Sequence, residues 1–98
     1  MSVFAAALDI VETHGWRRIT ETRGALQTNV TLHEAVGLAR RRLGGDLTAA
    51  ALMERLEALL EGPALDTWHD APERAAADIA ALLRRATRAA MDTLEPAP

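Results

Sequence analysis

Apolar residues recur at intervals of three and four along most of the chain, and this spacing is typical of amphipathic helices. The first such stretch runs from Val3 to about His14, with Ser2 placed to cap its beginning. Gly15 follows it, and glycine commonly ends a helix because it adopts left-handed backbone angles without strain. The apolar face of this helix is expected to contain Phe4, Leu8 and Val11.

Two further helices are predicted in the middle of the chain. The second spans 31–43 and opens with Thr31 and Glu34, whose spacing is that of a capping box. The third begins after Asp46 or Thr48 and ends before Gly62. Its apolar stripe is formed by Leu52, Leu56, Leu59 and Leu60.

A fourth helix is predicted from Pro72 to about Leu94, because proline fits the first turn of a helix, and Asp70 is expected to cap it. Residues 64–69 before it are expected to form about one turn, and residues 17–30 an irregular loop or a short hairpin. Residues 95–98 are expected to form a frayed tail.

The fold class is therefore all-α, a single small domain of four helices over residues 1–94. The core is expected to be built from leucine and alanine, with Trp16 and Trp68 sealing its ends, since aromatic residues make up only 3% of the chain. No stretch is apolar enough for a membrane span, and the beginning of the chain lacks the basic region of a signal peptide. We therefore expect a cytoplasmic protein.

Composition excludes several kinds of chemistry. The chain has no cysteine, lysine or tyrosine. A disulfide framework, a thiolate zinc site, a Schiff-base lysine and a tyrosine nucleophile are therefore excluded, and we expect no cofactor. His14, His33 and His69 do not have the spacing of metal ligands, so no metal site is predicted either.

Charge divides unevenly along the chain, whose net charge is −3. Residues 1–45 hold six arginines against four acids, whereas residues 46–98 hold five arginines against ten acids. The arginines cluster at 40–42 and again at 84, 85 and 88, which keeps open the alternative of a nucleic-acid-associated regulator. Nucleic acid is nevertheless a less favoured partner, because the third helix carries Glu54, Glu57 and Glu61, which phosphate would repel.

The adjacent pair His69 and Asp70 is the most site-like feature of the sequence. An imidazole beside a carboxylate could serve acid–base chemistry, so a small enzyme or ligand-binding protein with a pocket of Trp16, Trp68, His69 and Asp70 is a further alternative. The competing interpretation is that Asp70 caps the last helix while His69 lies in the preceding turn. Adjacent side chains also point apart in most backbone conformations, which favours this second interpretation.

The segment Trp68-His69-Asp70-Ala71-Pro72-Glu73-Arg74, followed by Asp78-Ile79 and Leu82-Leu83, resembles a motif in a family of small uncharacterised helical proteins common in actinobacteria and their phages. In that family an aromatic residue and Asn-Asp precede a proline and an arginine, then a final helix; here His69 stands where asparagine is usual. The stretch from Leu8 to Trp16 and the helix from Glu34 to Leu43 are also similar in order and spacing. The resemblance implies a helical fold and carries no activity.

The leading functional hypothesis is a non-enzymatic protein–protein interaction module, either a homodimer or an accessory subunit. A core this small buries little area, so apolar helix faces are expected to be shared with a partner. The contact residues predicted are Leu60, Leu83, Arg84 and Arg88, and none is predicted to be catalytic.

Overall fold

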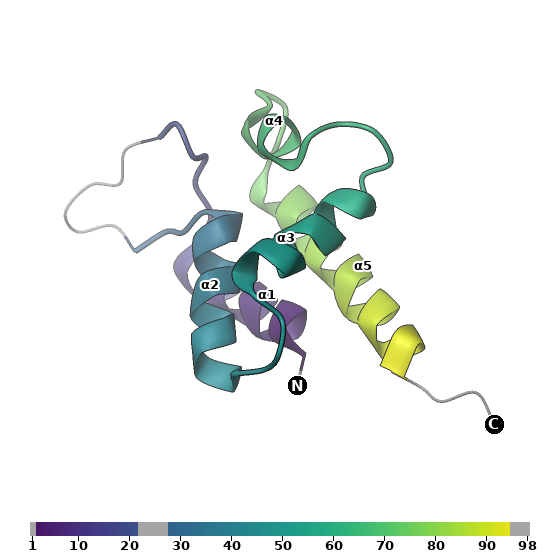
Figure 1. Cartoon of the computed structure of the whole chain (residues 1–98). Helices are drawn as coiled ribbons and strands as arrows, with labels where there is room; N and C mark the ends of the chain where they lie inside the picture. The colour runs from purple at the N-terminus through teal and green to yellow at the C-terminus, as the bar shows by residue number, and fades with distance from the viewer. Residues whose placement is uncertain (1, 22–27, 95–98) are drawn as a thin grey trace.

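The computed structural model describes residues 2–21 and 28–94, and within them it contains five helices (Figure 1). They are α1 (Val3–His14), α2 (Leu32–Leu43), α3 (Ala49–Ala58), α4 (Leu65–Asp70) and α5 (Ala76–Leu94). The all-α fold class is thus confirmed. The turn expected over residues 64–69 forms the six-residue helix α4, which brings the number of helices in the described residues to five.

Most helix ends lie where the sequence predicts them, because local side chains satisfy the exposed backbone groups. Ser2 Oγ accepts a hydrogen bond from the amide of Ala5 at the beginning of α1. At the beginning of α2, Thr31 and Glu34 form the complete capping box. At α3, Thr48 and not Asp46 is the cap.

The last helix begins at Ala76, so the prediction that it begins at Pro72 is wrong. Asp70 does not cap it, because its carboxylate binds the backbone of a distant segment instead. The carboxylate of Asp78 accepts from the amide of Ala75 at 2.9 Å and so stabilises the first turn of α5. Residues 71–74 form a connecting loop before this turn.

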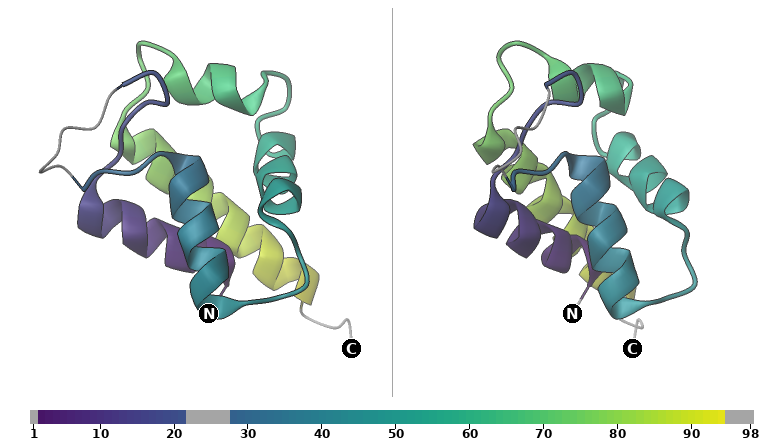
Figure 2. Two further views of the ribbon diagram at one scale, coloured as in Figure 1. Left: turned by 60° about the vertical axis from the view of Figure 1, so that its left-hand side comes forward. Right: turned by 90° about the vertical axis from the view of Figure 1, so that its left-hand side faces the viewer.

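α1 packs against α2 and α5, and α3 joins this group through contacts with α2 and α5. The short helix α4 lies across one end of the molecule, where it links α3 to α5 (Figure 2). The large side chains that are fully buried come from all five helices: Ile10, Leu32, Val36, Leu56, His69, Ile79 and Leu83. Leu83 therefore lies inside the core of one chain and is not available as a contact surface, which corrects its predicted role.

Two segments meet where the chain leaves α1 and enters α2. The amide of Arg17 donates to the carbonyl of Val30 at 3.0 Å, and the amide of Val30 donates to the carbonyl of Gly15 at 2.9 Å. Trp16 and Val30 thereby form an isolated bridge. The tip of the expected loop or hairpin, residues 22–27, lies outside the described residues, as does the tail 95–98. Among the described residues, the structure contains no helix that is both long and apolar enough to cross a membrane.

Candidate functional site

A fully buried imidazole, that of His69, stands at the junction of α4 with α1 and α2. Its Nε2 accepts hydrogen bonds from the indole Nε1–H of Trp16 at 2.8 Å and from the amide of Leu32 at 3.1 Å. Because Nε2 accepts twice, the ring proton lies on Nδ1, from where it donates to Asp70 over 2.7 Å. His69 therefore holds three segments of the chain together as a neutral imidazole.

Asp70 continues this network toward the segment that follows α1. Its two carboxylate oxygens accept from the backbone amides of Ile19 at 2.9 Å and Thr20 at 3.0 Å. The prediction that the His69 and Asp70 side chains point apart is therefore wrong: α4 ends at Asp70, and the amides of residues 19 and 20 hold its carboxylate beside the imidazole. Burial raises the pKa of Asp70, but the hydrogen bonds from His69 and from the Ile19 and Thr20 segment outweigh it and lower this pKa to about 2.

Two arginines brace the loop between α4 and α5. Arg18 Nη2 donates to the carbonyls of Ala71, Pro72 and Arg74, the last at 2.7 Å. The guanidinium of Arg74 lies 4.2 Å from the centre of the Trp68 ring, and its Nε donates to the Trp68 carbonyl at 2.8 Å. The stretch from Trp68 to Arg74 thus serves to hold α4 and this loop onto the rest of the molecule. Both tryptophans are half-buried and pack against the core.

The residues expected to form a pocket therefore build a structural hub. Trp16, His69 and Asp70 are brought together, whereas Trp68 contacts Arg74 instead. Both ring nitrogens of His69 are engaged within the protein, and desolvation lowers the pKa of His69 below 6.5 against the opposing effect of Asp70. A substrate cannot reach a histidine that is fully buried and has both ring nitrogens hydrogen-bonded within the protein.

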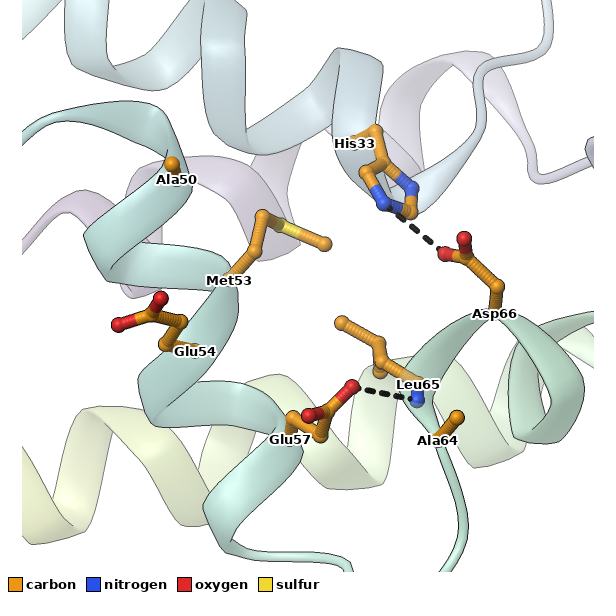
Figure 3. A pocket seen from close by; sticks show the side chains of 8 residues that line it. All are labelled: His33, Ala50, Met53, Glu54, Glu57, Ala64, Leu65 and Asp66. Carbon is orange, nitrogen blue, oxygen red and sulfur yellow. Dashed lines mark hydrogen bonds and ion pairs between the residues drawn. The ribbon is translucent and has the colours of Figure 1, made fainter.

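A concave surface lies beside this hub, between α3, α4 and the first turn of α2 (Figure 3). This α3–α4 groove has a volume of about 390 Å³. Met53 and Leu65 point into it, and their side chains form an apolar floor (Figure 3). The other residues that line it are His33, Ala50, Glu54, Glu57, Ala64 and Asp66.

The rim of the α3–α4 groove is acidic. His33 Nε2 lies 3.2 Å from Oδ1 of Asp66, and the two close one end of the groove. Across from them, Glu57 accepts from the amide of Leu65 at 2.8 Å, which supplies α4 with the cap that its own N-terminal residue does not provide. A second hollow of about 440 Å³ shares Glu54 and Glu57 with the groove and extends the acidic surface to Glu61.

A smaller hollow, of about 270 Å³, lies between α1 and α5. Ala5 and Leu8 of α1 contribute apolar surface to it, and Arg84, Thr87 and Arg88 of α5 complete its lining. The Arg84 guanidinium lies 3.3 Å from Glu12, with both side chains more than half exposed. Arg84 and Arg88 are exposed and lie one turn apart beside this hollow, and we call the row of α5 that carries them the α5 ridge.

Of the predicted contact residues, Arg84 and Arg88 are exposed, Leu60 is half-buried against the core, and Leu83 is buried. The groove residues His33, Glu57 and Asp66 were missed, because only the folded chain brings α2, α3 and α4 together. One signal was present: Glu54, Glu57 and Glu61 have the spacing of one helix face. Within the described residues, no group of three or more histidine and carboxylate side chains could hold a metal ion.

Comparison with known proteins places the chain in a family that has no assigned function. A family model described as "Family of unknown function (DUF6197)" matches residues 2–89. This match confirms the resemblance to a family of uncharacterised proteins. No curated protein and no solved structure matches the chain.

Proposed function

Given that the chain belongs to this family of unknown function, we propose that it is a non-enzymatic interaction module. The α3–α4 groove is its recognition surface, and the occupant is a helical segment of a partner protein that presents arginine beside apolar side chains. We also propose that the interaction takes place in the cytoplasm, with which the absence of cysteine agrees.

The observation that carries the proposal is the combination of an apolar floor with an acidic rim in one groove. Met53 and Leu65 offer apolar surface on which the methylene stem of an arginine packs. Glu54 and Asp66, which line the same groove, supply carboxylates for its guanidinium. Arginine suits such a site because its planar head binds carboxylates through paired hydrogen bonds.

The exposure of the rim determines what kind of binding to expect. The side chain of Asp66 is 74% exposed, so its attraction for a cation is screened by salt. Charges of this kind raise the association rate and select the partner more than they increase affinity. We therefore expect weak, salt-sensitive binding, with most of the affinity supplied by apolar contacts in the groove.

Two other functions gain less support from the described residues. A nucleic acid would be repelled by the acidic groove, although the exposed arginines of α5 would attract it. An enzyme built on His69 and Asp70 would need a substrate to reach an imidazole that is 0% exposed. A basic protein segment is the occupant that the charge and shape of the groove favour.

The test is a titration of the isotope-labelled protein with a helical peptide that carries leucine and arginine at four-residue spacing, followed by nuclear magnetic resonance. We expect the amides around Met53 and Leu65 to shift, and the Glu54→Gln/Asp66→Asn variant to bind about tenfold more weakly. The matched control is Asp9→Asn/Asp46→Asn, which removes the same charge from exposed positions elsewhere. Equal weakening in the control, or shifts that avoid the groove, would contradict the proposal.

A further inference from the structure

We infer that the segment bound in the α3–α4 groove is the α5 ridge of a second copy of the chain. This inference rests on the proposed function and names its partner. The molecule carries both halves of the interaction, an acidic groove over an apolar floor and an arginine-bearing helix beside apolar residues.

Arg84 and Arg88 supply the groove with the side chains that its charge requires. They are exposed and stand one turn apart on α5, so both point to the same side of the helix. Two guanidiniums complement the charge of a groove whose lining includes carboxylates from two helices, Glu54 on α3 and Asp66 on α4. Arg85, also exposed on α5, adds to the positive charge next to them.

Apolar contact completes the match between the two surfaces. Leu8 and Ala5 line the hollow beside Arg84 and Arg88, as Met53 and Leu65 line the groove. When the arginine side chains enter the groove, these apolar residues are brought toward each other and leave water together. The methylene stems of the arginines cover the remaining apolar surface.

Within the described residues, one ion pair already engages the ridge: the carboxylate of Glu12 lies 3.3 Å from the guanidinium of Arg84. The side chains of Arg84 and Glu12 are 56% and 54% exposed, and an exposed pair of this kind contributes little to stability. Arg84 can therefore leave Glu12 and pair with a carboxylate of the groove at little cost in free energy. Arg88 brings a second positive charge that this pair does not use.

The geometry of the pairing sets the form of the assembly. The groove is built from α2, α3 and α4, whereas the ridge lies on α5 next to α1, so two different surfaces meet at each contact. Such a contact yields a chain or a ring where it repeats from one copy to the next, and a closed pair where two copies exchange both contacts across a two-fold axis. Each contact is small, so the association depends strongly on concentration.

Sedimentation velocity tests this inference with two variants that each lose one surface. Arg84→Glu/Arg88→Glu removes the ridge, and Glu54→Gln/Asp66→Asn neutralises the groove. We expect the wild-type mass to rise with concentration above that of one chain, and each variant alone to associate at least about tenfold more weakly. An equimolar mixture of the two variants should form pairs and stop there, because it contains one intact ridge and one intact groove per pair.

Three results would overturn the inference: a wild-type protein that stays a single chain up to about 1 mM, variants that associate like the wild type, or a mixture that forms no pairs. Circular dichroism on each variant shows whether it is folded, so that loss of association is not confused with unfolding. The peptide titration separates the two proposals. If the groove binds the arginine peptide but the wild-type protein stays a single chain, the interaction module stands and the second copy is not its partner.

Discussion

The indole of Trp16 donates its N–H to Nε2 of the buried His69, over 2.8 Å and across 53 positions of sequence. This bond joins the end of α1 to α4. It also makes Nε2 a hydrogen-bond acceptor. Nδ1 already carries a proton, so Nε2 is the nitrogen that a second proton would have to occupy. Protonation of His69 therefore opposes the native arrangement.

The first prediction concerns the pH dependence of stability. Burial lowers the pKa of His69 in the folded protein below 6.5. At pH values between this lowered pKa and 6.5, the unfolded chain therefore binds more protons than the folded protein does. The stability contributed by this histidine is complete above pH 6.5 and is lost as pH falls below it. Urea unfolding from pH 8 to 5 measures the effect. The control is His69→Gln, which retains an acceptor but does not titrate, and whose free energy of unfolding should fall less over the same range.

The second prediction concerns Asp70→Asn. The substitution weakens the bonds from the amides of Ile19 and Thr20 and from the imidazole, and we expect a loss of about 2 kcal/mol in the free energy of unfolding. The Ile19 and Thr20 amides should also exchange with solvent faster. Asp66→Asn, in the same helix but at an exposed carboxylate, should change stability by less than about 0.5 kcal/mol. Because the folded pKa of Asp70 is about 2, the difference between wild type and Asp70→Asn should disappear as pH falls from 3.8 toward 2.

The third prediction is that Leu83 contributes to the core of the single chain. Leu83→Ala removes a side chain that is 0% exposed and should cost about 3 kcal/mol. Leu43→Ala, at a position that is 44% exposed, should cost less than about 0.5 kcal/mol. Thermal unfolding at two protein concentrations separates the core role from a contact role. A cost that grows with concentration would contradict the core assignment.

The fourth prediction is that Arg18 cannot be replaced by lysine. Arg18 Nη2 donates to three carbonyls of the loop between α4 and α5, a geometry that an ammonium group does not reproduce. We expect Arg18→Lys to lower the free energy of unfolding by about 1 to 2 kcal/mol. Arg85→Lys on the exposed side of α5 is the matched control, and an equal effect at both positions would show that the loop contacts do not matter.

The sequence allowed the helices to be predicted wherever their ends depend on neighbouring residues. Thr31 and Glu34 form their capping box from a spacing of three residues, so the beginning of α2 could be read directly. The beginning of α5 could not, because Asp70 and the loop after it are held by Arg18, Ile19 and Thr20, which lie about fifty positions away.

The same limit applies to the candidate site. The adjacency of His69 and Asp70 in the sequence suggests a pair, but the orientation of their side chains depends on the amides of Ile19 and Thr20. The groove depends on how α4 lies against α3, and the contact that fixes it joins Glu57 to the amide of Leu65. Exposed arginines at 84 and 88 follow from helical spacing alone, whereas the burial of Leu83 beside them is set by how α5 packs in the core.

The contacts that hold α4 have a consequence for the order in which the chain assembles. Trp16, Arg18 and Leu32 meet residues 69–74 across sequence separations of 37 to 56 positions. Contacts of such separation carry a large entropic cost of loop closure, so we expect them to form after α1 and α2 have packed. The region from α4 to the beginning of α5 should then be the last part of the molecule to fold and the first to open. Since α4 also forms one wall of the groove, the recognition surface exists only once folding is complete.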